Sequence, residues 1–333
     1  MDALGGDRAP AEIVAGALAA ASDTIVPTVF GPAGLETSGL VHVVTTQELA
    51  MDEKPADAVR AKPDSSLVAA CRAVGEGGAD AVVSAGNTGA MLAACLLELR
   101  RLPGVYRPAI AVVIPARRGP SVLIDSGANA ESRPEHLLQF GEMGTIFAEE
   151  IIGITRPQVR LLSIGEEAEK GNQLIQEAHR LLAESDLNFR GNTEGRDLLE
   201  GAADVVVCDG FTGNVALKVL EGTIRTVLHG MREEISATSH GKLGGLLILP
   251  AVRTLRARLD PETYGGAYLL GLRGLAVIAH GNSSRTAIAN AIRLAARGVE
   301  HGVVGRLAER LAKESAGGRG SIGALSEPDR QVR

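Results

Sequence analysis

The sequence predicts an α/β fold, a three-layer αβα sandwich built around a mostly parallel, Rossmann-like sheet. Short apolar runs rich in β-branched residues and bounded by Gly, Pro or charged residues alternate with longer segments of helical spacing. The 333-residue chain is 45% hydrophobic but only 2% aromatic, so its core has to be built from Ala, Val, Leu and Ile. This composition suits stacked layers of strands and helices.

The elements follow one another in a regular order. Buried strands are predicted, from the β-branched runs, at residues 24–30, 41–44, 81–84, 110–114, 122–125, 159–164 and 205–209. Helices are predicted, from their apolar spacing, at residues 65–76, 89–100, 134–152, 167–183 and 212–229. Pro134 suits the first turn of its helix. Strand–helix–strand repetition of this kind predicts a mostly parallel sheet that is covered on both faces.

The chain is expected to form a single α/β domain over residues 1–315. A helical hairpin at about 236–260 is expected to protrude, because the apolar knot LGGLLILP is followed by Arg253, Arg256 and Arg258. The segment 316–333 is rich in Gly, Ser and charge, which predicts a disordered tail. Because no strand precedes the glycine turn that begins at Asp2, the true start is expected to lie upstream of Met1.

Composition excludes several classes of protein. The net charge of −6 and the scarcity of aromatic residues argue against nucleic-acid binding. Cys71, Cys95 and Cys208 form no C-x-x-C pair, which indicates buried thiols in a reducing compartment. The sequence shows no signal peptide, and its longest apolar stretch is about half the roughly 20 residues of a membrane span, so a cytoplasmic protein is expected. P-loop, dinucleotide, nucleophile-elbow and zinc motifs are absent, so neither a cofactor nor a metal is expected.

Most of the turns rich in Gly, Asn and Asp follow predicted strands, where open α/β sheets bind ligands. Glycine lets backbone N–H groups approach an anion, and the start of a helix favours negative charge. The turns are DALGGD from Asp2, SAGNTG from Ser84, DSGAN from Asp125, GEEAEKGN from Gly165, DGFTGN from Asp209 and HGNSS from His280. Their convergence on one edge of the sheet would form a phosphate site.

Lys170 and Asn214 are the candidate catalytic residues. Lys170 would neutralise phosphate, and Asn214 would donate to phosphate or to the oxyanion of a thioester. A solvent-facing lysine and an ordinary helix cap are the alternatives. The candidate substrate-binding residues lie in the same turns and are Gly5, Gly6, Asn87, Thr88, Gly127, Asn129, Gly213 and His280. The aspartates of these turns are expected to brace the loops, because bare carboxylates would repel phosphate.

The order of the longer motifs provides a more specific signal. DALGGDRAP, SAGNTGAMLA, DSGANAESRPEHLLQFGEMG, LLSIGEEAEKGNQL, NFRGNTEGRDLLEGAADVVVCDGFTGNVALK and YGGAYLLGLRGLAVIAHGNSS closely resemble the phosphate acyltransferase (PlsX) family of bacterial phospholipid synthesis. The resemblance runs from Asp2 to about Val304. It departs from the family at Arg8, where the family usually has His, and in the strand that usually precedes the first turn.

The resemblance implies that a fatty acyl group moves from acyl carrier protein to inorganic phosphate, which gives acyl phosphate and free carrier protein. It implies a fold like that of phosphate acetyltransferases and isopropylmalate dehydrogenases. It also implies a homodimer in peripheral contact with the membrane, whose product feeds a membrane glycerol-3-phosphate acyltransferase.

Two alternatives share the same loops. One is an enzyme like phosphate acetyltransferase that uses acyl-coenzyme A thioesters. The other is a non-catalytic protein that binds acyl chains or phosphate. Turnover with each thioester separates the two enzymes, and trapping of an acyl phosphate separates both from the binding protein.

Overall fold

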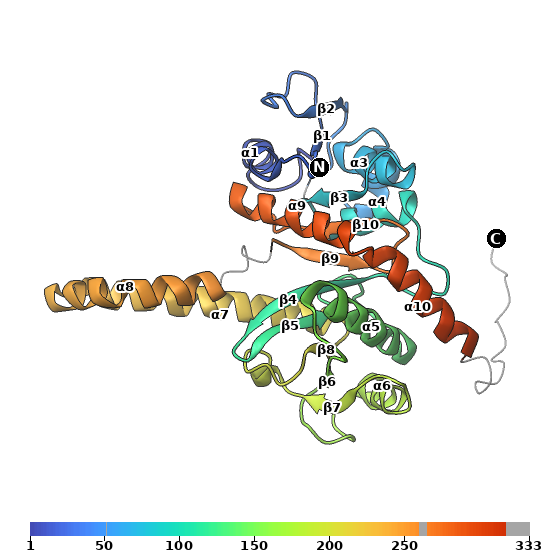
Figure 1. The fold of residues 1–333 in the computed structure, drawn as a ribbon, viewed down its shortest axis with the longest axis vertical. Coiled ribbons are helices and arrows are strands. Elements are labelled where there is room, and N and C mark those ends of the chain that lie inside the picture. The colour runs from blue at the N-terminus through green and yellow to red at the C-terminus, as the bar shows by residue number, and fades with distance from the viewer. Residues whose placement is uncertain (51, 260–264, 318–333) are drawn as a thin grey trace.

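A central eight-stranded sheet organises the computed structural model, which describes residues 1–50, 52–259 and 265–317 (Figure 1). Its strand order is β3-β10-β9-β4-β5-β8-β6-β7. The strands are β3 (Ala81–Ser84), β4 (Ala109–Ala116), β5 (Gly119–Ile124), β6 (Val159–Leu162), β7 (Phe189–Thr193), β8 (Val205–Val207), β9 (Ala267–Leu270) and β10 (Leu275–Ile278). A second, two-stranded parallel sheet pairs β1 (Thr28–Gly31) with β2 (Val41–Val44).

The large sheet is mixed, although most of its strand pairs are parallel. Strands β3 and β10 pair in parallel, as do β5, β8, β6 and β7 in sequence. Strand β4 is antiparallel to both of its neighbours, β9 and β5, and β9 is antiparallel to β10. Strands β3, β10 and β4 therefore run opposite to the other strands of the sheet.

The mixed topology corrects one expectation about the turns. Because the β4–β5 hairpin reverses the chain and β9 is inserted antiparallel, the turns after β3 and β10 lie at the opposite strand ends from those after β5 and β8. The glycine turns do not converge on one shared edge of the sheet. They meet instead across the central strands, around a cavity over β4, β9 and β10.

The first residues of the chain connect the two sheets. Asp2 forms a parallel bridge with Phe30, whose N–H donates to the Met1 carbonyl at 2.9 Å. On the other side, the Asp2 N–H donates to the carbonyl of Val83 at 3.1 Å. Extended backbone therefore does lead into the first glycine turn, although two residues form too short a run to be recognised as a strand from the sequence.

Helices cover both faces of the sheet (Figure 1). The side chains of successive strand residues point to opposite faces, so Val82 and Val83 join different clusters of the core. The cluster on one face includes side chains from α1 (Ala11–Ala20), α5 (Pro134–Phe147), α6 (Gln173–Ala183), α9 (Arg285–Glu300) and α10 (Val303–Gly317). The other face packs against α2 (Pro55–Ala61), α3 (Ser66–Gly75), α4 (Thr88–Glu98) and α7 (Gly210–Ala237). The result is the expected three-layer arrangement.

Helix α7 continues beyond the sheet and forms a hairpin with α8 (Ser239–Leu259), which extends away from the body of the molecule (Figure 1). The expected hairpin at 236–260 is therefore only the tip and second arm of a longer one, and residue 260 lies outside the described part. Exposed leucines lie in the first half of α8, where Leu247 is 80% exposed. Within the described ranges, no helix combines the length and the apolar character that crossing a membrane requires.

The tail expected at 316–333 falls almost entirely outside the described residues. Ala316 and Gly317 are described, and they belong to helix α10 rather than to a disordered segment. Helix α10 itself was not among the predicted helices.

Candidate active site

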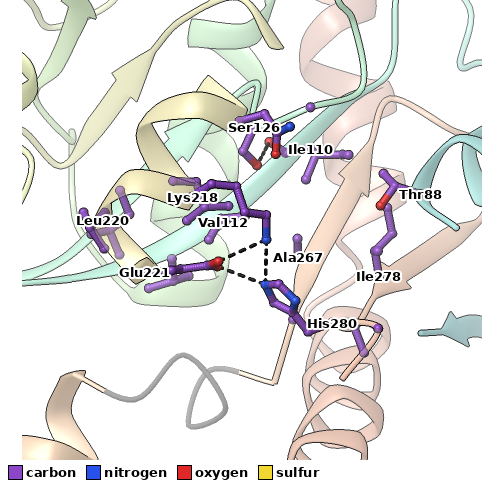
Figure 2. A pocket seen from close by; sticks show the side chains of 18 of the residues that line it. Thr88, Ile110, Val112, Ser126, Lys218, Leu220, Glu221, Ala267, Ile278 and His280 are labelled. Atoms are coloured by element: carbon purple, nitrogen blue, oxygen red, sulfur yellow. Dashed lines mark hydrogen bonds and ion pairs between the residues drawn. The ribbon is translucent and has the colours of Figure 1, made fainter. Parts of the chain in front are cut away.

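A cavity of about 410 Å³ lies over β4, β9 and β10 on one face of the sheet. The strand side chains that line it are apolar and include Ile110, Val112, Ala267 and Ile278 (Figure 2). Helix α7 provides one wall, and the turns after β3 and β10 provide another. The cavity therefore lies between two parts of the molecule. The β3/β10 half contributes the turns after β3 and β10, and the β5/β8 half contributes the turn after β5 and helix α7, which follows β8. It is the place where the oppositely directed turns meet.

Several candidate residues line this cavity together. They are Asn87, Thr88, Gly127, Asn214 and His280. The Asn87 side chain also caps α4, because it accepts a hydrogen bond from the Ala90 N–H at 3.0 Å. Asn214 is not a cap, since Asp209 caps α7 by accepting from the Thr212 N–H. Asn214 lies inside the first turns of α7, next to Gly127.

The remaining glycines act by allowing the turns to pack closely. A Cβ atom on Gly5 would lie 2.7 Å from the backbone nitrogen of Gly86. A Cβ atom on Gly213 would lie 2.0 Å from the carbonyl oxygen of Asp125, a distance that no side chain tolerates. Gly6, with φ of +111°, would bring a Cβ to 2.9 Å from the Gly281 carbonyl. These glycines, together with the buried Asn129, support the lining turns from behind.

Buried carboxylates brace the turns, as the sequence predicts. Asp125 accepts five N–H hydrogen bonds, from the backbone of Ile110, Gly127, Ala128 and Asn129 and from the Asn129 side chain. Burial raises the pKa of Asp125, and these donors act in the opposite direction. Asp2 similarly accepts from the Ser66 and Ser84 hydroxyls at 2.6 and 2.7 Å.

Lys170 lies apart from this group, in the exposed loop after β6. It is not among the described residues that line the cavity. Because β8 lies between β6 and β5, the Lys170 loop is next to the turn that carries Asn214 and one turn further from Gly127. The loop is held in place by the buried Asn192, whose side chain donates to the Glu167 carbonyl at 2.7 Å.

Two charged side chains that line the cavity, Lys218 and Glu221, were missed by the sequence analysis. They follow Asn214 at spacings of four and seven residues, so all three lie on one face of α7. The glycine turn ended at Asn214, and the helical period of the segment after it would have identified both. Glu221 approaches His280 and Lys218 at 3.0 Å each. Burial acts to raise the pKa of Glu221, but the hydrogen bonds and charges of His280 and Lys218 outweigh it and lower that pKa.

Comparison with known proteins relates most of the chain to one group of enzymes. A family model described as "Fatty acid synthesis protein" matches residues 1–306. The chain is 46% identical over 323 residues to a phosphate acyltransferase of Heliobacterium modesticaldum, covering 93% of this chain and 96% of that protein. It is 47% identical over 327 residues to a phosphate acyltransferase of Desulfitobacterium hafniense, covering 95% and 98%.

Solved structures share the fold at much lower identity. A branched-chain phosphotransacylase from Enterococcus faecalis superposes with a TM-score of 0.58 at 17% identity, covering 90% of this chain and 98% of that one. The EutD phosphotransacetylase from Staphylococcus aureus superposes with a TM-score of 0.54 at 17% identity, covering 86% and 90%. These similarities confirm the predicted α/β fold and carry no information about the substrate.

Proposed function

Because the chain belongs to the family of phosphate acyltransferases, enzymes of fatty acid and phospholipid synthesis, we propose that its cavity transfers a fatty acyl group from acyl carrier protein to inorganic phosphate. The observation that carries this proposal is the pairing of two environments in one cavity. Turns suited to an anion face an apolar strand surface. Such a site can hold phosphate and an acyl thioester at the same time.

The phosphate would bind where the polar turns meet. Thr88 begins α4, so the helix N-terminus favours an anion there. Gly127 and Asn214 face each other from the β5 and β8 turns, and His280 comes from the β10 turn. Lys170 would add positive charge from the neighbouring loop, which requires its flexible stem to reach toward Asn214.

The acyl chain would lie along the apolar strands. Ile110, Val112 and Ile114 alternate along β4 and face the same side, and Leu220 and Ile224 of α7 line the cavity as well. Each buried methylene contributes about 0.8 kcal/mol, so this surface would favour a fatty acyl group over a short one.

The proposed step balances without a cofactor. An oxygen of HPO₄²⁻ attacks the thioester carbonyl carbon, the C–S bond breaks, and the proton of the phosphate hydroxyl passes to the departing thiolate. A thiol has a pKa of about 8.5, so the thiolate leaves readily. Asn214 would stabilise the negative charge that develops on the carbonyl oxygen.

The direct test is to trap the product. Protein, inorganic phosphate and acyl-acyl carrier protein are incubated, and acyl phosphate is captured with hydroxylamine. Capture that requires phosphate and protein together is the expected result. A parallel reaction with acyl-coenzyme A identifies the thioester. Turnover of acyl-coenzyme A alone would mean that coenzyme A, and not acyl carrier protein, carries the acyl group. If no acyl phosphate is captured with either thioester, acyl transfer to phosphate is contradicted.

The protruding hairpin suggests where the enzyme works. Its exposed leucines, of which Leu246 is 68% and Leu247 80% exposed, are followed by the exposed Arg253 on the same helix. Arg258, further along, instead donates to the Arg117 carbonyl at 2.7 Å and so ties the base of the hairpin to the body of the molecule. Apolar side chains beside cations suit both a homodimer interface and an anionic membrane surface. Docking there would release the labile acyl phosphate close to the membrane glycerol-3-phosphate acyltransferase that consumes it. Residues 1–315 would act as one catalytic domain.

Co-sedimentation with anionic liposomes tests the hairpin's role. The wild type is expected to bind, and the double variant Leu247→Glu, Leu249→Glu is expected to bind less. Equal binding by both would assign the hairpin to the interface between subunits, where a change in oligomeric mass of the variant would be seen instead.

A further inference from the structure

Lys218, Glu221 and His280 form a cluster that joins the two halves of the cavity (Figure 2). Lys218 and Glu221 come from α7 in the β5/β8 half, whereas His280 comes from the turn after β10. The Glu221 carboxylate approaches the His280 Nε2 with one oxygen and the Lys218 ammonium with the other, each at 3.0 Å. Lys218 Nζ and His280 Nε2 are also 3.0 Å apart.

The hydrogens of this cluster cannot satisfy all three contacts at once. The His280 Nε2 can carry one hydrogen, which it can donate to Glu221. In that state Lys218 has no acceptor on the imidazole, so the 3.0 Å contact between the two nitrogens brings two donors together. Glu221 thus holds an ammonium and an imidazole N–H against each other, an arrangement that an acceptor placed between them would stabilise.

Burial distinguishes the roles of the three side chains. The Glu221 side chain is only 10% exposed, whereas those of Lys218 and His280 are 52% and 51% exposed. The carboxylate therefore lies behind the two donors, and its charge is compensated by Lys218. An ammonium has three hydrogens and Glu221 uses one of them, so two can bind an incoming ligand.

We propose that Lys218 contacts the substrate phosphate in this cavity and that Glu221 is a positioning residue, which holds Lys218 and His280 in place to receive it. This inference rests on the proposed function, because it assigns the anion to the phosphate substrate. Lys218 lies on the same helical face as Asn214, one turn further along. A phosphate between Asn214 and Lys218 would lie beside the apolar strands that take the acyl chain. Because HPO₄²⁻ carries two negative charges, Lys218 and Lys170 together would balance it.

The test compares matched variants in two assays. Lys218→Met removes the cation and keeps the aliphatic stem, Lys218→Arg keeps the cation, and Glu221→Gln keeps the shape of the positioning residue. Steady-state kinetics give KM for phosphate, KM for the acyl thioester and kcat. Isothermal titration with inorganic phosphate alone gives binding without turnover.

Arg180→Met provides the matched control. Arg180 is also a helical cation paired with a nearby carboxylate, because its guanidinium lies 3.1 Å from Glu184, the residue that caps the end of its helix. Its side chain is 64% exposed, and its helix, α6, covers the opposite face of the sheet from the cavity. The control therefore removes a surface cation of the same kind far from the proposed phosphate contact.

Lys218→Met is expected to raise KM for phosphate roughly 10- to 100-fold, the range of one charge-assisted hydrogen bond, and to leave KM for the thioester within about twofold. Lys218→Arg should recover part of that loss. Glu221→Gln should raise the same KM by a smaller factor with an unchanged melting temperature, which a purely structural role would not do. Arg180→Met should match the wild type.

A phosphate KM and a phosphate Kd within about twofold of wild type in Lys218→Met would overturn the inference, as would equal losses for both substrates. The titration separates this outcome from failure of the proposed function. Phosphate binding that depends on Lys218, without acyl transfer by the wild type, would contradict the function and leave the phosphate contact standing.

Discussion

The candidate residues fall into two groups. Some line the cavity, and others make hydrogen bonds or close contacts that stabilise the turns around it. Asn87, Gly127 and His280 were predicted from turn chemistry alone and do line the cavity. Asn129 was predicted to bind substrate, but its side chain is used within the protein, where it donates to the Pro108 carbonyl at 2.7 Å. Glu221 was missed because the candidate motif ended at Asn214, although the helical period places Glu221, seven residues further on, on the same face of α7.

Asn214→Ala is expected to lower kcat by roughly 10²–10³, because it removes one preorganised donor from the transition state. The structure leaves the capping of α7 to Asp209, so the melting temperature of the variant should stay close to that of wild type. The measurement is acyl phosphate formation at saturating substrates. A rate within about tenfold of wild type would exclude Asn214 as an oxyanion or phosphate donor.

Lys170→Ala is expected to abolish acyl phosphate formation without unfolding the protein. Lys170 is exposed in its loop, so the loss of its side chain removes little packing. The phosphate dependence of the rate is the measurement. Near-normal activity at saturating phosphate would show that Lys170 does not neutralise the phosphate, and would leave that role to groups that line the cavity.

Packing between helices α1 and α9 places the glycine turn that begins at Asp2 next to the turn that begins at His280. Gly16 of α1 packs directly on Ile288 of α9, and Glu12 accepts hydrogen bonds from the Arg285 guanidinium and from its backbone N–H. Neither helix was predicted, since α1 is nearly uniformly apolar and α9 follows a glycine-rich turn. Strand β9 was missed for a related reason, because four apolar residues between glycines give no clear period.

Gly16→Ala is expected to destabilise the fold by about 1–3 kcal/mol, the usual cost of overpacking. Alanine normally stabilises a helix by about 1 kcal/mol relative to glycine. At this position, however, its Cβ would lie 2.5 Å from the Ile288 Cβ. Gly305→Ala in α10 is the control, because no atom lies within 4 Å of its added Cβ. Chemical denaturation should show opposite signs for the two variants. A stabilising Gly16→Ala would contradict the close packing of α1 on α9.

The Glu12–Arg285 pair predicts a pH dependence. Hydrogen bonds from Arg285 lower the pKa of Glu12 from 4.5 to about 2. A carboxyl with a lowered pKa in the folded state stabilises the fold above its ordinary pKa, and this contribution is lost as pH falls toward the folded value. The difference in melting temperature between wild type and Glu12→Gln should therefore be largest above about pH 5 and shrink toward about pH 3. A difference that does not change with pH would exclude this pair as its source.

For the whole molecule, the sequence predicted the layers better than the direction of the strands. Alternating apolar runs were enough to identify a sheet covered by helices on both faces. The position of the site was not predictable in the same way, because it depends on the long-range insertion of β9 beside β4. Because β9 is antiparallel to β4 and to β10, and β4 is antiparallel to β5, the two sides of the sheet run in opposite directions. Turns from opposite strand ends therefore lie around one cavity.

If this cavity holds both substrates, a side chain that fills it should prevent acyl transfer. Ala267 of β9 faces the cavity and is 8% exposed, so Ala267→Phe would occupy the space over the central strands. Leu97→Phe, at a position 51% exposed on α4, is the matched control. Acyl phosphate captured from acyl-acyl carrier protein should fall to near background in the filled variant and stay normal in the control, with both proteins folded. Normal acyl phosphate formation by folded Ala267→Phe would exclude this cavity as the site that holds both substrates.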